Sequence, residues 1–223
     1  MSWQRASRAP RLVRALRGVR AASLAAGHTC SAVVDGEGAV HAMGYGRFWQ
    51  LGLGHDRDQE TPREVEGLHD VAEVAFGGLH AVAVKRGGQV LAWGGNEHGC
   101  LGIGQAGRAE REPSLLPKVA AASVSCGWQH TAAVGSAGEL LTWGWGGSAG
   151  EASSVGGEAA SGGQLGLGDD FDRWTPQRLS SVILDGGRVA EAAGGGEAAP
   201  RVRFLQVSCG FNHTAAVIEV AAP

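Results

Sequence analysis

One short pattern is written four times along this chain, and such repetition limits the folds that the chain can adopt. A histidine begins an apolar run at four places, and the runs read H-T-C-S-A-V-V, H-A-V-A-V, H-T-A-A-V and H-T-A-A-V. The four histidines are His28, His80, His130 and His213. After each of the first three runs come a Met-Gly or Trp-Gly pair, then Gln-Leu-Gly or Cys-Leu-Gly, then a proline. A repeat of this kind predicts an array of small units that bury their apolar faces against one another.

The spacing of the histidines gives the length of one unit. The successive intervals are 52, 50 and 83 residues. We attribute the two extra residues of the first interval to a longer hairpin at residues 35–38. Two insertions, near residues 147–162 and 185–200, account for the excess in the third interval. The underlying repeat is therefore about fifty residues long.

Composition indicates that the units are built from short strands. Glycine accounts for 38 of the 223 residues, which suits tight turns but weakens helix interiors by about 1 kcal/mol per residue. The apolar runs are short, rich in Val, Leu, Ala and Trp, and bounded by Gly, Asp, Ser or Pro. Three or four antiparallel strands per unit, repeated around an axis, form the blades of a β-propeller. We therefore predict an all-β fold, a partial β-propeller of about four blades.

The third unit carries the clearest resemblance to a known family. It reads C-G-W-Q-H-T at residues 126–131, then Trp143-Gly144, then G-Q-L-G-L-G-D at residues 163–169, then Thr175-Pro176. This pattern resembles the repeat of the regulator of chromosome condensation family. The resemblance covers residues 10–217. It leaves residues 1–9 as a basic N-terminal arm and residues 218–223 as a C-terminal tail.

The resemblance implies a propeller ring of seven blades, which four units do not complete. The chain is therefore expected to be either a fragment of a longer protein or an open arc. The exposed strand edges of an open arc favour self-association. The two insertions, near residues 147–162 and 185–200, are rich in Gly, Ala and Glu, and we predict that they form flexible loops.

Charge is distributed unevenly along the chain. Six arginines and no acidic residue lie in the first thirty residues, whereas the remaining residues carry a net charge of −9. An acidic surface repels phosphate backbones, so we expect no direct nucleic-acid binding through the propeller faces. No run of about eighteen apolar residues occurs, so no membrane span is predicted. We expect a cytoplasmic or nuclear protein, with organellar targeting by the arginine-rich N-terminus as the alternative.

The recurring histidines and tryptophans are predicted to be structural. Equivalent residues of successive blades lie apart around a ring, so we expect the four histidines to hydrogen-bond neighbouring backbone rather than to gather at a metal ion. Trp93 and Trp143 hold the Trp-Gly position and are expected to pack in the core. No set of nucleophile, base and orienting group is apparent, and neither a cofactor nor a metal is expected.

Trp128 differs from these residues because it lies in the turn before a strand. The sequence around it, G-W-Q-H-T, is similar to the G-W-R-H-T signature of the plant UV-B photoreceptor branch of the family, for which the resemblance implies a tryptophan chromophore and a homodimer held by arginines. Gln129 replaces the arginine here. We assign Ala26, Gly78 and Phe211 to the positions equivalent to Trp128. Trp128, Gln129 and Phe211 are candidates for a protein contact.

These observations favour a non-enzymatic protein-interaction propeller whose loops bind a protein partner. Two alternatives follow from the resemblance alone. One is guanine-nucleotide exchange on a small GTPase, as in the founding member of the family. The other is a UV-B photoreceptor-like function.

Overall fold

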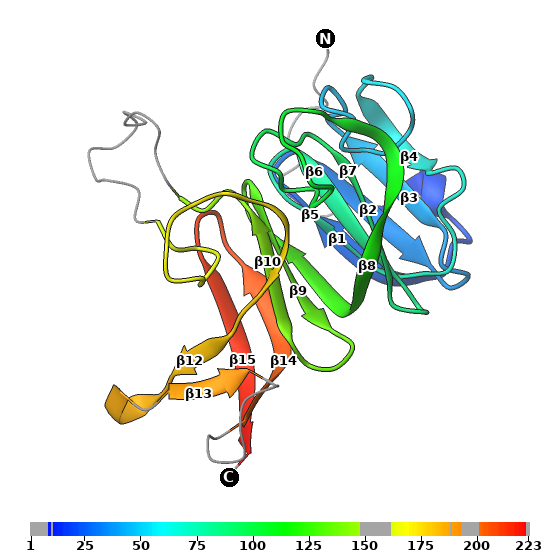
Figure 1. The fold of residues 1–223 in the computed structure, drawn as a ribbon. Coiled ribbons are helices and arrows are strands. Elements are labelled where there is room, and N and C mark those ends of the chain that lie inside the picture. The colour runs from blue at the N-terminus through cyan, green and yellow to red at the C-terminus, as the bar shows by residue number, and fades with distance from the viewer. Residues whose placement is uncertain (1–8, 10, 148–161, 188, 193–200, 222–223) are drawn as a thin grey trace.

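The computed structural model of the chain describes residues 9, 11–147, 162–187, 189–192 and 201–221, and its regular structure is almost entirely β-sheet (Figure 1). Two short 3₁₀ turns, η1 (Arg14–Leu16) and η2 (Asp185–Gly187), are the only helical segments in the described part of the chain. No helix in that part is long and apolar enough to cross a membrane. The predicted all-β fold is confirmed.

Each of the first three blades contains four antiparallel strands in chain order. The first blade consists of β1 (Ala21–Ala26), β2 (Cys30–Asp35), β3 (Val40–Gly44) and β4 (Gln59–Glu64). The second consists of β5 (Val71–Phe76), β6 (His80–Lys85), β7 (Gln89–Gly94) and the first half of β8 (Glu110–Cys126). The third consists of the second half of β8, β9 (His130–Gly135), β10 (Leu140–Gly144) and β11 (Arg173–Arg178).

Strand β8 serves two blades because it is 17 residues long. Its N-terminal half pairs with β7, with Glu110 opposite Gly94, and its C-terminal half pairs with β9, with Ala121 opposite Gly135. Lys118, between the halves, has a φ of 71°, a left-handed conformation that breaks the straight run of the strand. The second and third blades are consequently continuous in one seven-stranded sheet.

The fourth blade departs from the pattern of the others. Its antiparallel pair is β14 (Arg201–Cys209) with β15 (Thr214–Ala221). Two further strands extend this sheet: β13 (Val189–Ala192) lies beside β14, and β12 (Ser181–Ile183) lies beside β13. β13 runs antiparallel to β12 and parallel to β14. In Figure 1 these strands extend away from the first three blades.

Two of the predicted boundaries change in this blade. The prediction that residues 185–200 form a flexible loop is wrong where the structure describes them, because β13 buries Ala190 and Ala192 against the third and fourth blades. Residues 218–221, assigned to a tail, continue strand β15. Residues 1–8 of the arm and residues 148–161 of the first insertion lie outside the described residues.

The sheet register also corrects the alignment of the first unit. In the second and third blades the repeat histidine lies opposite the glycine of the Trp-Gly pair, whereas in the first blade Cys30 takes that place. The prediction that His28 is the first repeat histidine is therefore wrong. The predicted longer hairpin at residues 35–38 is wrong too, because Cys30 and His80 are 50 residues apart. The register of a sheet depends on which side chains are buried, and not on the similarity of a short sequence motif.

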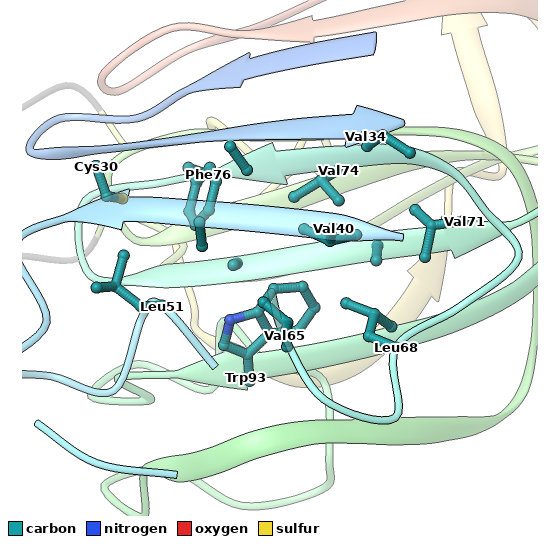
Figure 2. Packing of buried hydrophobic residues seen from close by; sticks show 14 residues of the cluster. Cys30, Val34, Val40, Leu51, Val65, Leu68, Val71, Val74, Phe76 and Trp93 are labelled. Atoms are coloured by element: carbon teal, nitrogen blue, oxygen red, sulfur yellow. The ribbon is translucent and has the colours of Figure 1, made fainter. Parts of the chain in front are cut away.

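The hydrophobic core lies between blades rather than within them. Trp93 of β7 lies in one cluster with Val40 and Leu51 of the first blade (Figure 2). A second cluster joins the second and third blades around Trp143, and a third joins the third and fourth blades around Phe204. Each blade therefore depends on its neighbours for burial, as expected of an array of repeats.

Candidate protein-interaction face

One side of the arc carries two sets of connections that lie close together. The loops that follow β3, β7 and β10 leave from the end at which β2, β6 and β9 begin. Backbone bonds join the two sets, since Gly95 N donates to Leu79 O at 2.8 Å and Trp145 N donates to Gln129 O at 2.9 Å. We call this side the turn-bearing face. It comprises turns 27–29, 77–79, 127–129 and 210–213 and the described parts of loops 45–58, 95–109 and 145–172.

The glycine that precedes each repeat histidine is required by a close approach. A Cβ built on Gly127 would overlap the imidazole of His130. Gly77 and Gly210 meet the equivalent imidazoles of their own turns in the same way. The G-x-x-H pattern therefore reflects a contact between backbone and imidazole that only glycine permits.

The buried histidines link neighbouring blades through threonine. His80 Nε2 lies 2.9 Å from Thr131 Oγ1, and that hydroxyl donates to Cys100 O at 2.9 Å. Because the threonine proton is used in the second bond, His80 Nε2–H is the donor in the first. Trp143 Nε1 donates to the same carbonyl at 2.8 Å. One carbonyl of the second blade thus anchors two side chains of the third.

This link recurs at the next junction and is replaced at the first. His130 Nε2 lies 3.0 Å from Thr214 Oγ1, which donates to Gln164 O at 2.8 Å. At the junction of the first and second blades, Cys30 and Ala81 occupy the histidine and threonine positions. Both members of the pair are therefore replaced together, and neither is left buried without its partner.

The repeat tryptophans are enclosed in the same junctions. Trp93 and Trp143 are 0% exposed. Trp93 Nε1 donates to Gln50 O at 2.9 Å, the counterpart of the bond made by Trp143. Gly52 and Gly102 have φ angles of 71° and 73° and lie directly against the two indoles. Each indole is therefore fixed by both a hydrogen bond and a glycine turn of the preceding blade.

Burial keeps the junction histidines neutral. Desolvation lowers the pKa of His80 from its ordinary value of 6.5 to about 3, with a smaller contribution from His130. Desolvation also lowers the pKa of His130 to about 4. Nδ1 of each ring is buried without a hydrogen-bond partner, so protonation would bury an N–H that has no acceptor. Within the described ranges, no three His, Cys, Asp or Glu side chains gather to hold a metal ion.

An aromatic cluster crosses the turn-bearing face. Trp128 stacks on Phe211, with ring centroids 4.8 Å apart and planes at 17°, and it meets His28 in a T-shaped contact at 4.8 Å and 88°. Gly78, in the intervening turn, leaves room for the indole, because a Cβ there would lie 2.6 Å from Trp128 Cε3. We call His28, Trp128 and Phe211 the aromatic cluster.

The aromatic cluster occupies a single position of the repeat. Phe211 and Gly78 were correctly assigned to the position of Trp128, but Ala26 was not, because the register gives that position to His28. The place of His28 in the aromatic cluster is hidden in the sequence, because His28 is followed by threonine as the repeat histidines His130 and His213 are. The signal that identifies it is the spacing, since residues 28, 78 and 128 are fifty apart.

Backbone hydrogen bonds hold the turns that carry the cluster. Gly78 N donates to Trp128 O at 3.0 Å, and Trp128 N donates to Phe211 O at 3.0 Å. A shallow hollow of about 270 Å³ lies beside the cluster, lined by the three aromatic side chains, the last residues of β1, β5, β8 and β14, and the glycines that follow them. The described lining includes no Asp, Glu, Lys or Arg.

Two side-chain contacts on the turn-bearing face involve carboxylates. Gln129, which follows Trp128, donates Nε2 to Glu97 Oε2 at 3.1 Å. His98 Nδ1 lies 2.9 Å from Asp172 Oδ2, and this pair joins a loop of the second blade to a loop of the third. Gln129 thus orients an exposed acid beside the turn that carries Trp128. Glu97 was not singled out from the sequence, because its contact with Gln129 joins residues 32 positions apart.

Family models match most of the chain. The model described as the regulator of chromosome condensation (RCC1) repeat matches residues 37–84, 87–134 and 159–217. A second model of the same repeat matches residues 71–100. The matched segments contain the turns, the junction histidines and the tryptophans described above.

Related proteins share the repeat over parts of their length. The human E3 ubiquitin-protein ligase HERC2 is 36% identical over 109 residues, which are 48% of this chain and 2% of that protein. The ultraviolet-B receptor UVR8 of Arabidopsis thaliana is 32% identical over 145 residues, which are 64% of this chain and 30% of the receptor. The solved structure of Prp20p from Saccharomyces cerevisiae, described together with its binding to Gsp1p and histones, is similar with a TM-score of 0.70 at 18% identity.

The likeness to Prp20p covers 91% of this chain and 44% of that protein, and at this identity it shows the fold alone. The chain thus spans less than half the length of each of these three proteins. The repeat models, in contrast, match well over half of the chain itself. On these matches and on its fifty-residue blades, the chain belongs to the regulator of chromosome condensation (RCC1) repeat family.

Proposed function

We propose that the chain is a non-enzymatic protein-interaction segment of a β-propeller and that it binds a protein partner through its turn-bearing face. The observation that carries this proposal is the exposure of the aromatic cluster. Phe211 is 58% exposed although it stacks on Trp128, whereas the repeat tryptophans are fully buried. Exposed, ordered aromatic side chains are characteristic of protein–protein interfaces.

The scaffold beneath the cluster supports this proposal. The turns are joined by backbone bonds, and the blades below them are joined by the histidine–threonine links. A partner would therefore meet a surface that is already formed. Binding to a preformed surface avoids much of the entropic cost of ordering loops.

The chemistry of the buried thiols and imidazoles supports the non-enzymatic part of the proposal. Burial raises the pKa of Cys30 and the pKa of Cys100 to about 12, so both thiols stay protonated and are poor nucleophiles. His80 and His130 are neutral and are engaged in blade junctions. These groups serve packing rather than proton transfer.

Guanine-nucleotide exchange and UV-B perception stay predictions from the resemblance. Binding of Gsp1p is described for Prp20p, and ultraviolet-B reception is described for UVR8. Among the described residues, the rings that contact Trp128 belong to Phe211 and His28 rather than to other tryptophans, so the cluster favours protein contact over light perception. The cytoplasmic or nuclear location also stays a prediction.

Site-specific photocrosslinking tests the proposed face. A benzophenone amino acid is placed at position 211, and a matched control is placed at position 37, in a hairpin at the opposite ends of the strands. We expect position 211, but not position 37, to capture a protein that can be identified by mass spectrometry. If that protein is a small GTPase, its rate of labelled-nucleotide release with and without the chain decides the exchange prediction.

The affinity of the purified partner then provides the decisive comparison. We expect Phe211→Ala to weaken binding about tenfold or more, and Glu37→Gln to leave it unchanged, in isothermal titration calorimetry. An affinity that is indifferent to both Phe211→Ala and His28→Ala would contradict the proposal.

A further inference from the structure

If the turn-bearing face binds a partner, as proposed above, the chemistry of the face indicates what the partner presents. The accessible ring of the aromatic stack is that of Phe211. Trp128 is contacted by Phe211, by His28 and by the turn containing Gly78, whereas Phe211 is 58% exposed. The face of an aromatic ring carries partial negative charge and attracts a cation.

A carboxylate beside the turn that carries Trp128 is paired with no basic side chain in the described part of the chain. Glu97 is exposed, and its hydrogen bond is with the neutral amide of Gln129. None of the ion pairs between described residues includes Glu97. Asp169, in contrast, pairs with Arg173 at 2.6 Å. The amide of Gln129 orients the Glu97 carboxylate without neutralising it.

The hollow beside the cluster adds no opposing charge. Its lining consists of aromatic rings, small side chains and backbone, with no lysine or arginine among the described residues. The region from the hollow to Glu97 therefore combines an open ring face with an unneutralised acid. This combination is complementary to a cation that is also planar and apolar on its faces.

We propose that the turn-bearing face receives an arginine-containing segment of a protein partner, in which a guanidinium stacks on Phe211 and a guanidinium of the same segment pairs with Glu97. Arginine fits both contacts, because its planar group stacks on rings and its paired N–H donors match a carboxylate. A lysine ammonium is a compact, strongly hydrated charge and makes the stacking contact less well. An acidic segment would be repelled by Glu97.

Selection of short peptides tests this inference independently of the natural partner. A phage library of random nine-residue peptides is selected on the 223-residue chain, and the tightest binders are synthesised and measured by fluorescence polarisation. We expect the selected peptides to contain arginine. Replacing that arginine by lysine is expected to weaken binding about fivefold.

Matched variants of the chain locate the two contacts. We expect Glu97→Gln and Phe211→Leu each to weaken peptide binding about fivefold, and Phe211→Tyr to retain it because the ring face remains. Glu37→Gln removes the same charge at the other end of the blades and should have no effect. Gln129→Leu should weaken binding less than Glu97→Gln, since the charge stays but is no longer oriented.

Two outcomes would overturn the inference. One is that no arginine-containing peptide is selected. The other is that selected peptides bind equally well to Glu97→Gln and to Phe211→Leu. Either result leaves the proposed function standing if position 211 still captures a partner whose affinity falls with Phe211→Ala, so the two failures are distinguishable.

Discussion

At the scale of single residues, recurrence at fifty-residue spacing has two different meanings in this chain. His80 and His130 recur as the same residue and are buried in blade junctions. Positions 28, 78 and 128 also recur, but they hold His, Gly and Trp, and the rings of His28 and Trp128 meet on the surface in the space left by Gly78. A recurring residue therefore serves packing, and a recurring position with varied residues forms the candidate binding surface.

The histidine–threonine link should couple neighbouring blades energetically. Thr131→Ala leaves His80 Nε2–H buried without its acceptor, and His80→Cys removes the donor to Thr131 Oγ1, so we expect each change to cost about 1–3 kcal/mol. The double variant reproduces the natural pair of Cys30 and Ala81, so we expect it to cost about 1 kcal/mol less than the sum of the single changes. Urea unfolding measures each variant. His80→Cys combined with Thr214→Ala is the control and should be additive, and additivity in both cases would contradict the link.

The same histidines should make stability depend on pH. The native pKa values of His80 and His130 are about 3 and 4, against an ordinary value of 6.5. Between these values the unfolded chain binds protons that the native chain does not. The contribution of these two histidines to stability is therefore fully present above about pH 6.5. The free energy of unfolding falls as the pH decreases below this value, by about 1.4 kcal/mol per pH unit for each histidine.

Urea unfolding between about pH 7 and pH 5 measures this dependence. We expect His80→Gln to remove about half of the slope. A wild-type stability that is flat across this range would show that the two imidazoles are accessible to protons in the native state.

The residues show which features of the site could be anticipated. The burial of Trp93 and Trp143, and the equivalent turn positions of Trp128 and Phe211, follow from repeat position, but the stacking of Trp128 on Phe211 does not. The His-Thr pair at residues 28–29 resembles the repeat motif but does not occupy its position. Only the pairing of Cys30 with Gly44 shows that Cys30 holds the place of the repeat histidine. Contacts such as that of Glu97 depend on how adjacent blades are placed, which a linear pattern does not contain.

At the scale of elements, β8 is the strand whose behaviour the repeat pattern does not describe. It runs as one strand from the outer edge of the second blade to the inner edge of the third. The change of direction is concentrated at Lys118, which is exposed and has positive φ. Strand β13 could not be recognised from the sequence either, because its alanines lie in a Gly/Ala-rich stretch typical of loops. These alanines become buried only when β14 lies alongside.

The conformation of Lys118 can be tested by substitution. A β-branched residue is strained at positive φ, so we expect Lys118→Val to destabilise the chain by about 1–2 kcal/mol. Lys118→Gly should be neutral or slightly stabilising, because glycine adopts this conformation without strain. Thermal unfolding measures both, with Lys85→Val in β6 as the control. Equal stability of the valine and glycine variants would refute the left-handed turn in β8.

At the scale of the whole molecule, burial between blades leaves two faces of the arc without a blade beside them. Leu24 of β1 is 74% exposed and Val217 of β15 is 54% exposed. Positions equivalent to these, such as Val74 and Val134, are buried where a neighbouring blade is present. The architecture and the number of blades could be predicted from the repeat, because the period fixes both. The strands added to the fourth blade could not.

These two faces should make the 223-residue polypeptide self-associate. We expect its mass, measured by light scattering after size exclusion, to rise with concentration above that of one chain, because apolar strand surfaces pair with one another. Val217→Lys should shift the population towards the monomer, and Glu37→Lys, a charge change in a hairpin, should not. A strictly monomeric wild-type chain would show that these faces are covered in another way.

The central claim is that the recurring residues hold the blades together while the aromatic cluster serves recognition. The free energies of unfolding of Phe211→Ala and His130→Ala, measured side by side in urea, test this claim most directly. We expect Phe211→Ala to cost less than about 1 kcal/mol and His130→Ala to cost about 2 kcal/mol or more. A loss for Phe211→Ala as large as that for His130→Ala would show that the cluster is a packing element and would contradict the claim.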